Sequence, residues 1–373
     1  MPAPGPTRPM PRAGLEELPP YSLGESTVPG VNRIIALASN ECATAPSPHA
    51  IEAYREAEAR LRRYPDGGVP SLRRAIAAHH GLAPERIVCG NGSEQLIDLI
   101  ARSYAGPGDE VVHAQYGYWL FRQASLIAGA TPVAVPEPDM RVEVDAILAT
   151  VTPRTRIVFL ANPNNPTGES IAAAEIRRLH AGLRRDILLV LDAAYADYVT
   201  EPGYEPGLAL AAHAENVVAL FTFSKVHGLA ALRVGWAYGP ADVVSLLDRV
   251  RSSTNVSGPA EAAACAALQD TAHVAQVCRE NAKERERFIA GARALGLAPR
   301  PSQGNFVLIA FPQGERQAAL AHADLKLRGI LLRPMNAYGL GHCLRTTIGT
   351  PDEMNLVLEA LQRFLRKPVT PAG

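Results

Sequence analysis

The sequence has 373 residues, and its 37 Lys and Arg side chains balance its 37 Asp and Glu side chains, so the formal net charge is zero. This balance offers no net attraction toward nucleic acid or an anionic membrane surface. The length allows a large domain and a smaller one, and no segment approaches the ~20 consecutive apolar residues of a membrane-spanning helix.

Seven prolines fall within the stretch MPAPGPTRPMPRAGLEELPP at the start of the chain. This composition predicts a mobile or extended arm over residues 1–20. The arm has no apolar central region and does not resemble a signal peptide. The five cysteines are scattered without paired spacing, which fits a reducing cytoplasmic compartment and argues against a zinc site or a disulfide framework.

Short apolar runs in the middle of the chain predict a series of β-strands. They cover residues 86–90, 110–114, 131–135, 156–161, 187–192, 216–221 and 233–238. Continuously apolar runs are typical of strands buried on both faces. Helical patterns lie between several of them, for example over 93–105, where Leu96, Ile97 and Ile100 share one face. The alternation predicts an α/β fold, with a mostly parallel sheet covered by helices on both faces, for a large domain at 51–254.

The pattern changes after about residue 255. A long helical stretch at 258–295 leads to three strand-like runs, and a helical pattern closes the chain. The strand-like runs are 304–311, 329–334 and 343–349. We therefore expect a smaller α+β domain over residues 255–373, with the N-terminal segment 21–50 packed against it.

Polar groups follow four of the predicted strands in chain order. They are GNGSEQ at 90–95, NPNNPTG at 162–168, Asp192 at the end of its strand, and TFSK at 222–225. Ligands of open α/β sheets bind beyond the carboxyl ends of the strands. The order of these four segments therefore predicts a ligand site at this edge of the sheet.

The residue types at this edge suggest individual roles. The free N–H groups where GNGS opens a helix form an anion site, which Arg233 and the hydroxyls of Thr222 and Ser224 would complete for a phosphate. A buried Asp192 needs a cationic partner, and a protonated pyridine nitrogen is one. Each feature taken singly also has a structural explanation as a tight turn, an internal ion pair, a cap or a packing residue.

Taken together, these groups specify pyridoxal 5'-phosphate. Lys225 would bond to the aldehyde of that cofactor, the glycine-rich turn and Arg233 would bind its phosphate, and Asp192 would pair with its ring nitrogen. Asn165 and Tyr195 would hold its ring oxygen.

The chain resembles the fold-type I, class II aminotransferases, and among them the histidinol-phosphate aminotransferase family. The motifs that carry the resemblance are LASNE (37–41), PSP (46–48), RYPD (63–66), GNGSEQ, YWLF (118–121), NPNNPTG, DAAY (192–195), TFSKVHGLAALRVGW (222–236), GNFVL (304–308), RGILLRPM (328–335) and YGLGHCLRTTIGT (338–350). The resemblance implies a cytoplasmic homodimer with shared active sites. Its activity would move an amino group between histidinol phosphate or an aromatic amino acid and 2-oxoglutarate.

The resemblance also implies roles for single residues around the cofactor. Lys225 would form the Schiff base and carry the proton between substrate and cofactor, Asp192 would pair with the ring nitrogen, and Tyr118 would stack on the ring. Tyr195 and Asn165 would bind the ring oxygen. The implied phosphate-binding residues are Gly92, Ser93, Thr222, Ser224 and Arg233, together with Tyr64 from the neighbouring subunit.

On the substrate side, the resemblance implies that Arg345 forms a two-pronged pair with a carboxylate, with Asn40 and Asn305 nearby. Arg333 and Tyr21 would face the distal end of the substrate, where the family places a phosphate group.

Two segments depart from the family pattern: NECATAPSP, with Cys42 to Ala45 at an expected substrate entrance, and AQYGYWLF around Tyr118. They leave open a specialised enzyme with the same cofactor that performs elimination, decarboxylation, oxidation or C–C bond formation. A non-enzymatic regulator would need a DNA-binding module, for which the short arm has no room.

Overall fold

The computed structural model describes residues 11–12, 14–18, 27–31 and 33–366. Most of the predicted arm therefore lies outside the described residues, and so does Tyr21 of the predicted substrate site. In the part of the chain that is described, no helix is long and apolar enough to cross a membrane.

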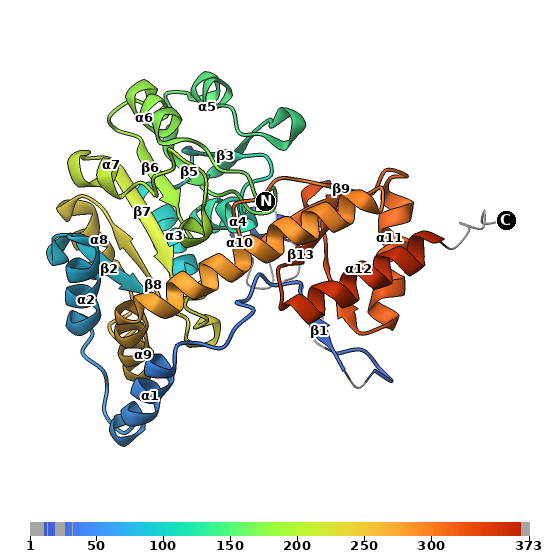
Figure 1. Cartoon of the computed structure of the whole chain (residues 1–373). Coiled ribbons are helices and arrows are strands. Elements are labelled where there is room, and N and C mark those ends of the chain that lie inside the picture. The colour runs from blue at the N-terminus through green and yellow to red at the C-terminus, as the bar shows by residue number, and fades with distance from the viewer. Residues whose placement is uncertain (1–10, 13, 19–26, 32, 367–373) are drawn as a thin grey trace, which may run out of the picture.

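A seven-stranded sheet forms the centre of the larger unit, in the order β2-β8-β7-β6-β5-β3-β4 (Figure 1). Its strands are β2 (Ile87–Gly90), β3 (Glu110–Ala114), β4 (Thr131–Val135), β5 (Thr155–Ala161), β6 (Leu188–Asp192), β7 (Val217–Thr222) and β8 (Gly235–Tyr238). Only β8 runs antiparallel to its neighbours in this sheet. The predicted mostly parallel mixed sheet is thus confirmed.

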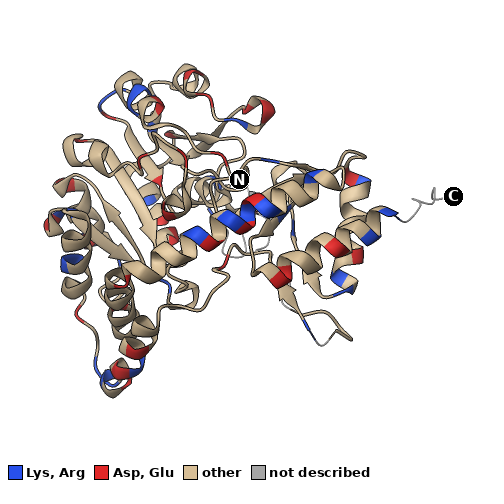
Figure 2. Ribbon diagram, viewed as in Figure 1, with Lys and Arg blue, Asp and Glu red and all other residues tan. Residues whose placement is uncertain are grey.

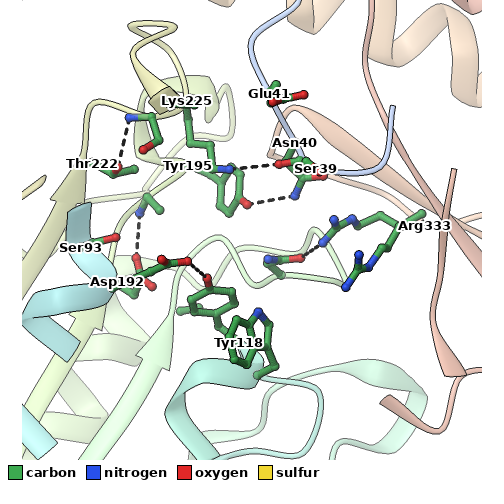
Figure 3. Close-up of a pocket in the computed structure, with 18 of the residues that line it drawn as sticks. Ser39, Asn40, Glu41, Ser93, Tyr118, Asp192, Tyr195, Thr222, Lys225 and Arg333 are labelled. Atoms are coloured by element: carbon green, nitrogen blue, oxygen red, sulfur yellow. Dashed lines mark hydrogen bonds between the residues drawn. The ribbon is translucent and has the colours of Figure 1, made fainter. Parts of the chain in front are cut away.

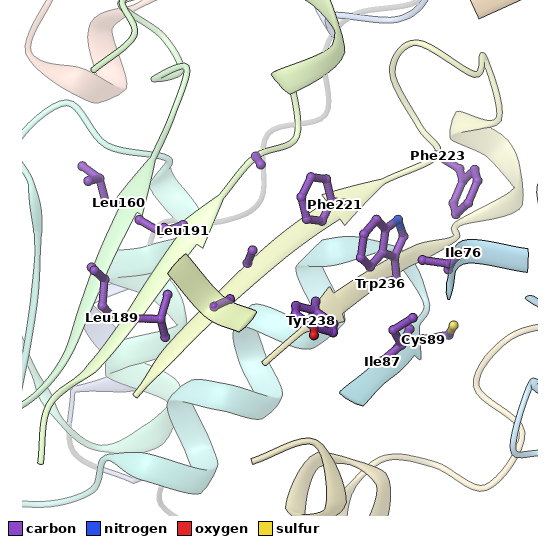
Figure 4. Packing of buried hydrophobic residues seen from close by; sticks show 14 of the residues in the cluster. Ile76, Ile87, Cys89, Leu160, Leu189, Leu191, Phe221, Phe223, Trp236 and Tyr238 are labelled. Atoms are coloured by element: carbon purple, nitrogen blue, oxygen red, sulfur yellow. The ribbon is translucent and has the colours of Figure 1, made fainter. Parts of the chain in front are cut away.

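Helices cover both faces of this sheet, because side chains of a strand alternate between its faces. In β6, Leu189 and Leu191 enter one core cluster and Val190 enters the other. The first cluster holds the stacked rings of Phe221 and Trp236, whose centroids are 4.2 Å apart (Figure 4). The helices are α1 (Pro48–Glu56), α2 (Pro70–His80), α5 (Val144–Thr150), α6 (Ala173–Gly182) and α7 (Leu208–His213) on that side, and α3 (Gly92–Tyr104), α4 (Trp119–Ala128) and α8 (Ala241–Val250) on the other.

The strand β4 departs from the expected burial on both faces. Thr131 and Ala134 are exposed, because β4 is the last strand at its edge of the sheet and pairs only with β3. An edge strand keeps one side open to solvent.

The helical stretch expected over 258–295 consists of two helices that pack differently. They are α9 (Gly258–Gln269) and α10 (Thr271–Ala294), separated by Asp270, whose side chain accepts a hydrogen bond from the backbone N–H of His273 at 3.1 Å. This is an N-cap arrangement. Ala263 and Ala264 of α9 are fully buried in the core of the larger unit, against α1 and α2. The expected domain boundary at 255 therefore cuts through this core, and the packing changes only at α10.

The smaller unit contains two sheets. In the first, β1 (Ile35–Ala36) runs parallel to β11 (Ile330–Leu331), so the N-terminal segment pairs with this unit. In the second, the antiparallel order is β12-β13-β10-β9, with β9 (Ala298–Pro299), β10 (Phe306–Ala310), β12 (Arg333–Pro334) and β13 (Cys343–Thr347). The run 329–334, expected as one strand, is divided between the two sheets because its two ends pair with different partners.

Three helices cover the core of the smaller unit: α10, α11 (Glu315–Leu327) and α12 (Pro351–Arg366). Phe288 of α10 and Val357 of α12 are fully buried there. The outer surface of α10 carries acidic and basic residues along its length, whereas the strands of the large sheet carry few (Figure 2). Short 3-10 helices connect the other elements: η1 (Leu15–Glu17), η2 (Ala57–Arg60), η3 (Pro84–Arg86), η4 (Pro138–Met140), η5 (Ala196–Tyr198), η6 (Ala230–Leu232) and η7 (Asn336–Tyr338).

Candidate active site

A pocket of about 370 Å³ opens at the carboxyl ends of β5, β6 and β7, and residues of the smaller unit line its other side (Figure 3). The sequence analysis placed its ligand site at this edge of the sheet. The predicted site residues that line the pocket are Asn40, Ser93, Tyr118, Asn165, Asp192, Tyr195, Thr222, Ser224, Lys225, Arg233, Arg333 and Arg345.

Lys225 follows the end of β7, and its side chain is half-buried in the pocket. Its Nζ donates a hydrogen bond to the backbone oxygen of Ser39 at 3.3 Å and lies 5.6 Å from the ring centroid of Tyr195. Burial, followed by the positive charge of Arg345, lowers the pKa of Lys225 to about 8. A substantial fraction of this amine is therefore neutral near physiological pH, as a nucleophilic amine requires.

Asp192 ends β6, the strand next to β7, and is 5% exposed. One of its carboxylate oxygens accepts a hydrogen bond from the backbone N–H of Ala194 at 3.1 Å. Burial raises the pKa of Asp192 to about 6. A cationic partner in the pocket would lower this pKa again and stabilise the carboxylate.

Arg233 reaches toward the first turn of α3. Its Nη1 donates to Ser224 Oγ at 3.2 Å, and its Nη2 donates to Glu94 Oε2 at 3.1 Å. Its backbone has a φ of 53°, a left-handed conformation that is strained for a residue with a side chain. Such strain is concentrated at functional sites.

Two glycines allow the backbone and the guanidinium to come this close to α3. A Cβ atom on Gly92 would lie 2.5 Å from Nη2 of Arg233. A Cβ atom on Gly235 of β8 would lie 2.4 Å from the backbone nitrogen of Ser93. The start of α3, the β7–β8 connection and the strand β8 therefore form one compact cradle with N–H, hydroxyl and guanidinium donors.

Asn165 and Tyr195 both line the pocket but have different partners. Asn165 Oδ1 accepts a short hydrogen bond from Arg345 Nη1, and Tyr195 Oη accepts one from Asn40 Nδ2 at 2.9 Å. Asn40 also has a left-handed φ, of 53°.

Arg345 and Arg333 stand directly opposite each other on the antiparallel strands β13 and β12. Arg345 is buried, and its Nη2 donates to the backbone oxygen of Ala38 at 2.8 Å. Its Nε is buried without a hydrogen-bond partner among the described residues. Two guanidinium groups side by side in a pocket favour an anionic ligand.

Three predicted site residues with a described structure do not line this pocket: Gly92, Asn305 and Tyr64. Gly92 lies next to the lining residue Ser93 at the start of α3. Asn305 lies behind the pocket and donates to the backbone oxygens of Asn40 and Glu41, at 3.1 and 3.0 Å, so it holds the segment that carries Asn40. Tyr64 is 92% exposed on the surface, and its contact with the site of a neighbouring subunit remains a prediction.

The departing residues Cys42 to Ala45 do not line the pocket as expected. Cys42, Ala43 and Thr44 line a second cavity instead, of about 540 Å³, between α10 and the start of α12. The other departure does reach the pocket, because Trp119 lines it next to Tyr118.

The pocket is also lined by residues for which the sequence predicts no role: Ser39, Glu41, Glu94, Trp119, Met335 and Tyr338. Glu94 and Glu41 belong to motifs that were noticed, GNGSEQ and LASNE, but their side chains had no assigned partner. Tyr338 Oη accepts a hydrogen bond from the backbone N–H of Trp119 at 3.2 Å, a contact across the chain for which the sequence held no signal.

Comparison with known proteins agrees with the site. The family whose sequence model matches residues 32–361 is described as aminotransferase class I and II. The chain belongs to this family. A histidinol-phosphate aminotransferase of Paramagnetospirillum magneticum is 49% identical over 361 residues, which is 96% of this chain and 99% of that protein. One from Rhodopseudomonas palustris strain HaA2 is 48% identical over 364 residues, 97% of this chain and 100% of that protein.

Among solved structures, a histidinol-phosphate aminotransferase from Sinorhizobium meliloti in complex with pyridoxal 5'-phosphate superimposes with a TM-score of 0.85. It is 31% identical, and the match covers 90% of this chain and 92% of that one. The predicted family, the PLP-dependent transferase fold of type I and the enzyme class are therefore confirmed. This chain is a pyridoxal-phosphate-dependent aminotransferase.

The pocket of this aminotransferase fits its cofactor on chemical grounds. It combines an amine with a lowered pKa, a buried carboxylate with a raised pKa, and a glycine-lined cradle that holds an arginine. These features match an aldehyde, a basic ring nitrogen and a phosphate, respectively.

Proposed function

We propose that this aminotransferase takes its amino group from histidinol phosphate, with aromatic amino acids as the next candidates, and passes it to 2-oxoglutarate. The observation that carries the proposal is the pair Arg333 and Arg345 on adjacent strands of one pocket. The two curated relatives described above, matched over nearly their whole length, carry the name of this activity.

The pocket residues divide the chemistry among them. Bound pyridoxal phosphate supplies an aldehyde and an electron-withdrawing ring. Lys225 is the amine that would hold the cofactor's aldehyde, and its pKa of about 8 suits it to take a proton from the substrate's Cα as a general base. Asp192 would hold a proton on the ring nitrogen, Tyr118 would pack against the ring, and Asn165 and Tyr195 would hold the ring oxygen.

The remaining groups position the cofactor and the substrates. Arg233, Ser93, Ser224 and Thr222 hold the cofactor's phosphate with the N-terminal N–H groups of α3. Arg345 binds the carboxylate of the keto acid, whereas histidinol phosphate has no carboxylate. Arg333 meets the phosphate at the distal end of histidinol phosphate, so the two arginines serve the two halves of the reaction differently.

The active enzyme is proposed to be a cytoplasmic homodimer in which Tyr64 reaches the partner's site. Tyr64 is 92% exposed, so its side chain is accessible to a second subunit. All five cysteines are free thiols, as expected in a reducing compartment.

A donor screen tests the proposal. The protein loaded with pyridoxal phosphate is supplied with histidinol phosphate, phenylalanine or tyrosine, and glutamate formation from 2-oxoglutarate is measured. We expect the highest kcat/KM with histidinol phosphate. Good turnover of an unphosphorylated donor, with none of histidinol phosphate, would overturn the substrate assignment. Consumption of a donor without amino transfer would instead support the alternative of a specialised PLP enzyme.

A further inference from the structure

The side chain of Glu94 lies among the groups expected to hold the cofactor. Glu94 belongs to the first turn of α3 and lines the pocket. Its Oε2 accepts a hydrogen bond from Arg233 Nη2 at 3.1 Å, and its Oε1 accepts one from Tyr118 Oη at 2.6 Å. The carboxylate therefore bridges the proposed phosphate-binding arginine and the proposed ring-stacking tyrosine.

An anionic side chain at this place conflicts with an anionic ligand. A phosphate and the Glu94 carboxylate would both require Nη2 of Arg233, and their like charges repel at close range. Both are also attracted to the positive N-terminus of α3. The other bonds of Arg233 involve Nη1 and leave Nη2 to whichever anion is present.

We propose that Glu94 takes the place of the phosphate in the cofactor-free protein and is displaced when the cofactor binds. The inference rests on the proposed role of Arg233 and goes beyond the reaction to the loading of the enzyme. The side chain of Glu94 is 48% exposed, so it can rotate into solvent without leaving a void. Glu94 thereby keeps Arg233 paired when no cofactor is bound. Its competition for Arg233 lowers the affinity of the protein for the cofactor.

The charge of Glu94 also acts on the two central ionisable groups. It raises the pKa of Lys225 and that of Asp192. A phosphate bound in place of Glu94 would carry at least the same negative charge, so the exchange of the two anions would keep this raising effect on both pKa values.

Glu94→Gln tests the proposal, because glutamine keeps the shape and removes the charge. The cofactor-free protein is titrated with inorganic phosphate, with pyridoxal phosphate and with pyridoxal, which lacks the phosphate. Half-exposed ion pairs are weak, so we expect about two- to fivefold tighter binding of the first two probes to the variant. The gain should be smaller for pyridoxal, which has no phosphate to compete with Glu94 for Arg233 and is affected only through Tyr118 and Lys225.

Glu41→Gln is the matched control. Glu41 lines the same pocket, but Arg233 donates its hydrogen bonds to Ser224, Ala230 and Glu94 and not to it. This variant should bind inorganic phosphate as the parent protein does. An equal gain in both variants would mean that overall charge, and not competition for Arg233, sets the affinity, and would overturn the proposal.

The sign of the effect separates the competing explanations. Weaker phosphate binding by Glu94→Gln would show that Glu94 orients Arg233 instead of competing for it, and unchanged binding would show no competition; each result overturns the inference. Arg233→Gln must in parallel weaken phosphate binding. If it does not, the proposed role of Arg233 fails, and the inference about Glu94 fails with it.

Thermal stability gives a second, independent readout. The cofactor-free Glu94→Gln protein should melt below the parent protein, because Arg233 loses its partner. Saturating inorganic phosphate should remove this difference, since ligand binding then supplies the missing anion. A difference in melting temperature that persists at saturation would contradict a placeholder role.

Discussion

Lys225 and Asp192 lie at the ends of adjacent strands, and burial moves both of their pKa values toward neutrality. The pKa of Lys225 falls to about 8 and that of Asp192 rises to about 6. The directions are opposite because burial disfavours the charged form of either group. Both residues can therefore change protonation near physiological pH, which is a property of acid–base sites.

The pKa of Lys225 predicts how cofactor loading depends on pH. Only the neutral amine attacks an aldehyde, and a lowered pKa means that this form accumulates at lower pH than in an ordinary lysine. The rate at which cofactor-free protein bonds to pyridoxal phosphate, followed by absorbance, should rise with pH with a midpoint near about pH 8. A rate that rises up to about pH 10.4, the range of an unperturbed lysine, would contradict this.

Arg345→Gln provides the control for this pH profile. The charge of Arg345 is the second cause of the lowered pKa of Lys225, after burial. Its removal should move the midpoint of the loading rate to higher pH while leaving the fold intact.

Substitution of Arg333 and substitution of Arg345 should impair different half-reactions. Arg333→Gln removes a charged partner of the distal phosphate and should cost about 1.5–3 kcal/mol with histidinol phosphate, or about 10- to 150-fold in kcat/KM. The same variant should leave phenylalanine turnover nearly unchanged. Arg345→Gln should first impair the half-reaction with the keto acid. Steady-state and single-turnover kinetics of each half-reaction check both expectations, and equal losses for both donors would remove Arg333 from the phosphate subsite.

At the scale of elements, the cradle depends on how closely β8 approaches the start of α3. Gly235 pairs with Gly90 of β2 and Thr222 of β7, so its strand cannot move without disturbing the sheet. The N-terminal N–H groups of α3 are held beside Arg233 by this contact. Gly92 and Gly235 thus allow the close packing that brings these N–H groups and Arg233 together.

Gly235→Ala should therefore damage both stability and cofactor binding. The new Cβ atom would meet the backbone of Ser93, Gly92 and Phe221 at 2.4, 2.6 and 2.9 Å, and backbone atoms cannot move aside as side chains do. We expect a loss of about 1–3 kcal/mol in the free energy of unfolding, measured by denaturant titration, and weaker phosphate binding. Gly106→Ala, where no atom lies within 4 Å of the new Cβ, should change stability by less than about 0.5 kcal/mol.

At the scale of the whole molecule, the pocket is assembled from two units. Asp192 and Lys225 come from the large sheet, Arg333 and Arg345 come from the four-stranded sheet, and Asn40 comes from the N-terminal segment that pairs with β11. A change in the relative position of the two units would therefore move the substrate arginines with respect to the reacting lysine.

The proposed dimer predicts complementation between two damaged proteins. Tyr64→Phe should weaken the site of the partner subunit, and Lys225→Ala should abolish turnover of its own site. Mixing the two variants gives heterodimers in which one site has both Lys225 and the partner's Tyr64, so activity should recover. Activity after mixing is compared with that of each variant alone. A strictly monomeric mass in solution, or no recovery after subunit exchange, would contradict the shared site.

The sequence alone determined the strands of the large sheet, the edge of the sheet that carries the pocket and most of the residue types predicted to line it. These features depend on local signals, namely short apolar runs and the polar residues that directly follow them. The tertiary structure decided the rest: the packing of α9 with α1 and α2, the division of 329–334 between two sheets, the position of Asn305 behind the pocket, and the contact of Glu94 with Arg233 and Tyr118. Each of these joins segments far apart in the chain, and neither periodicity nor a motif states which distant surface a side chain will meet.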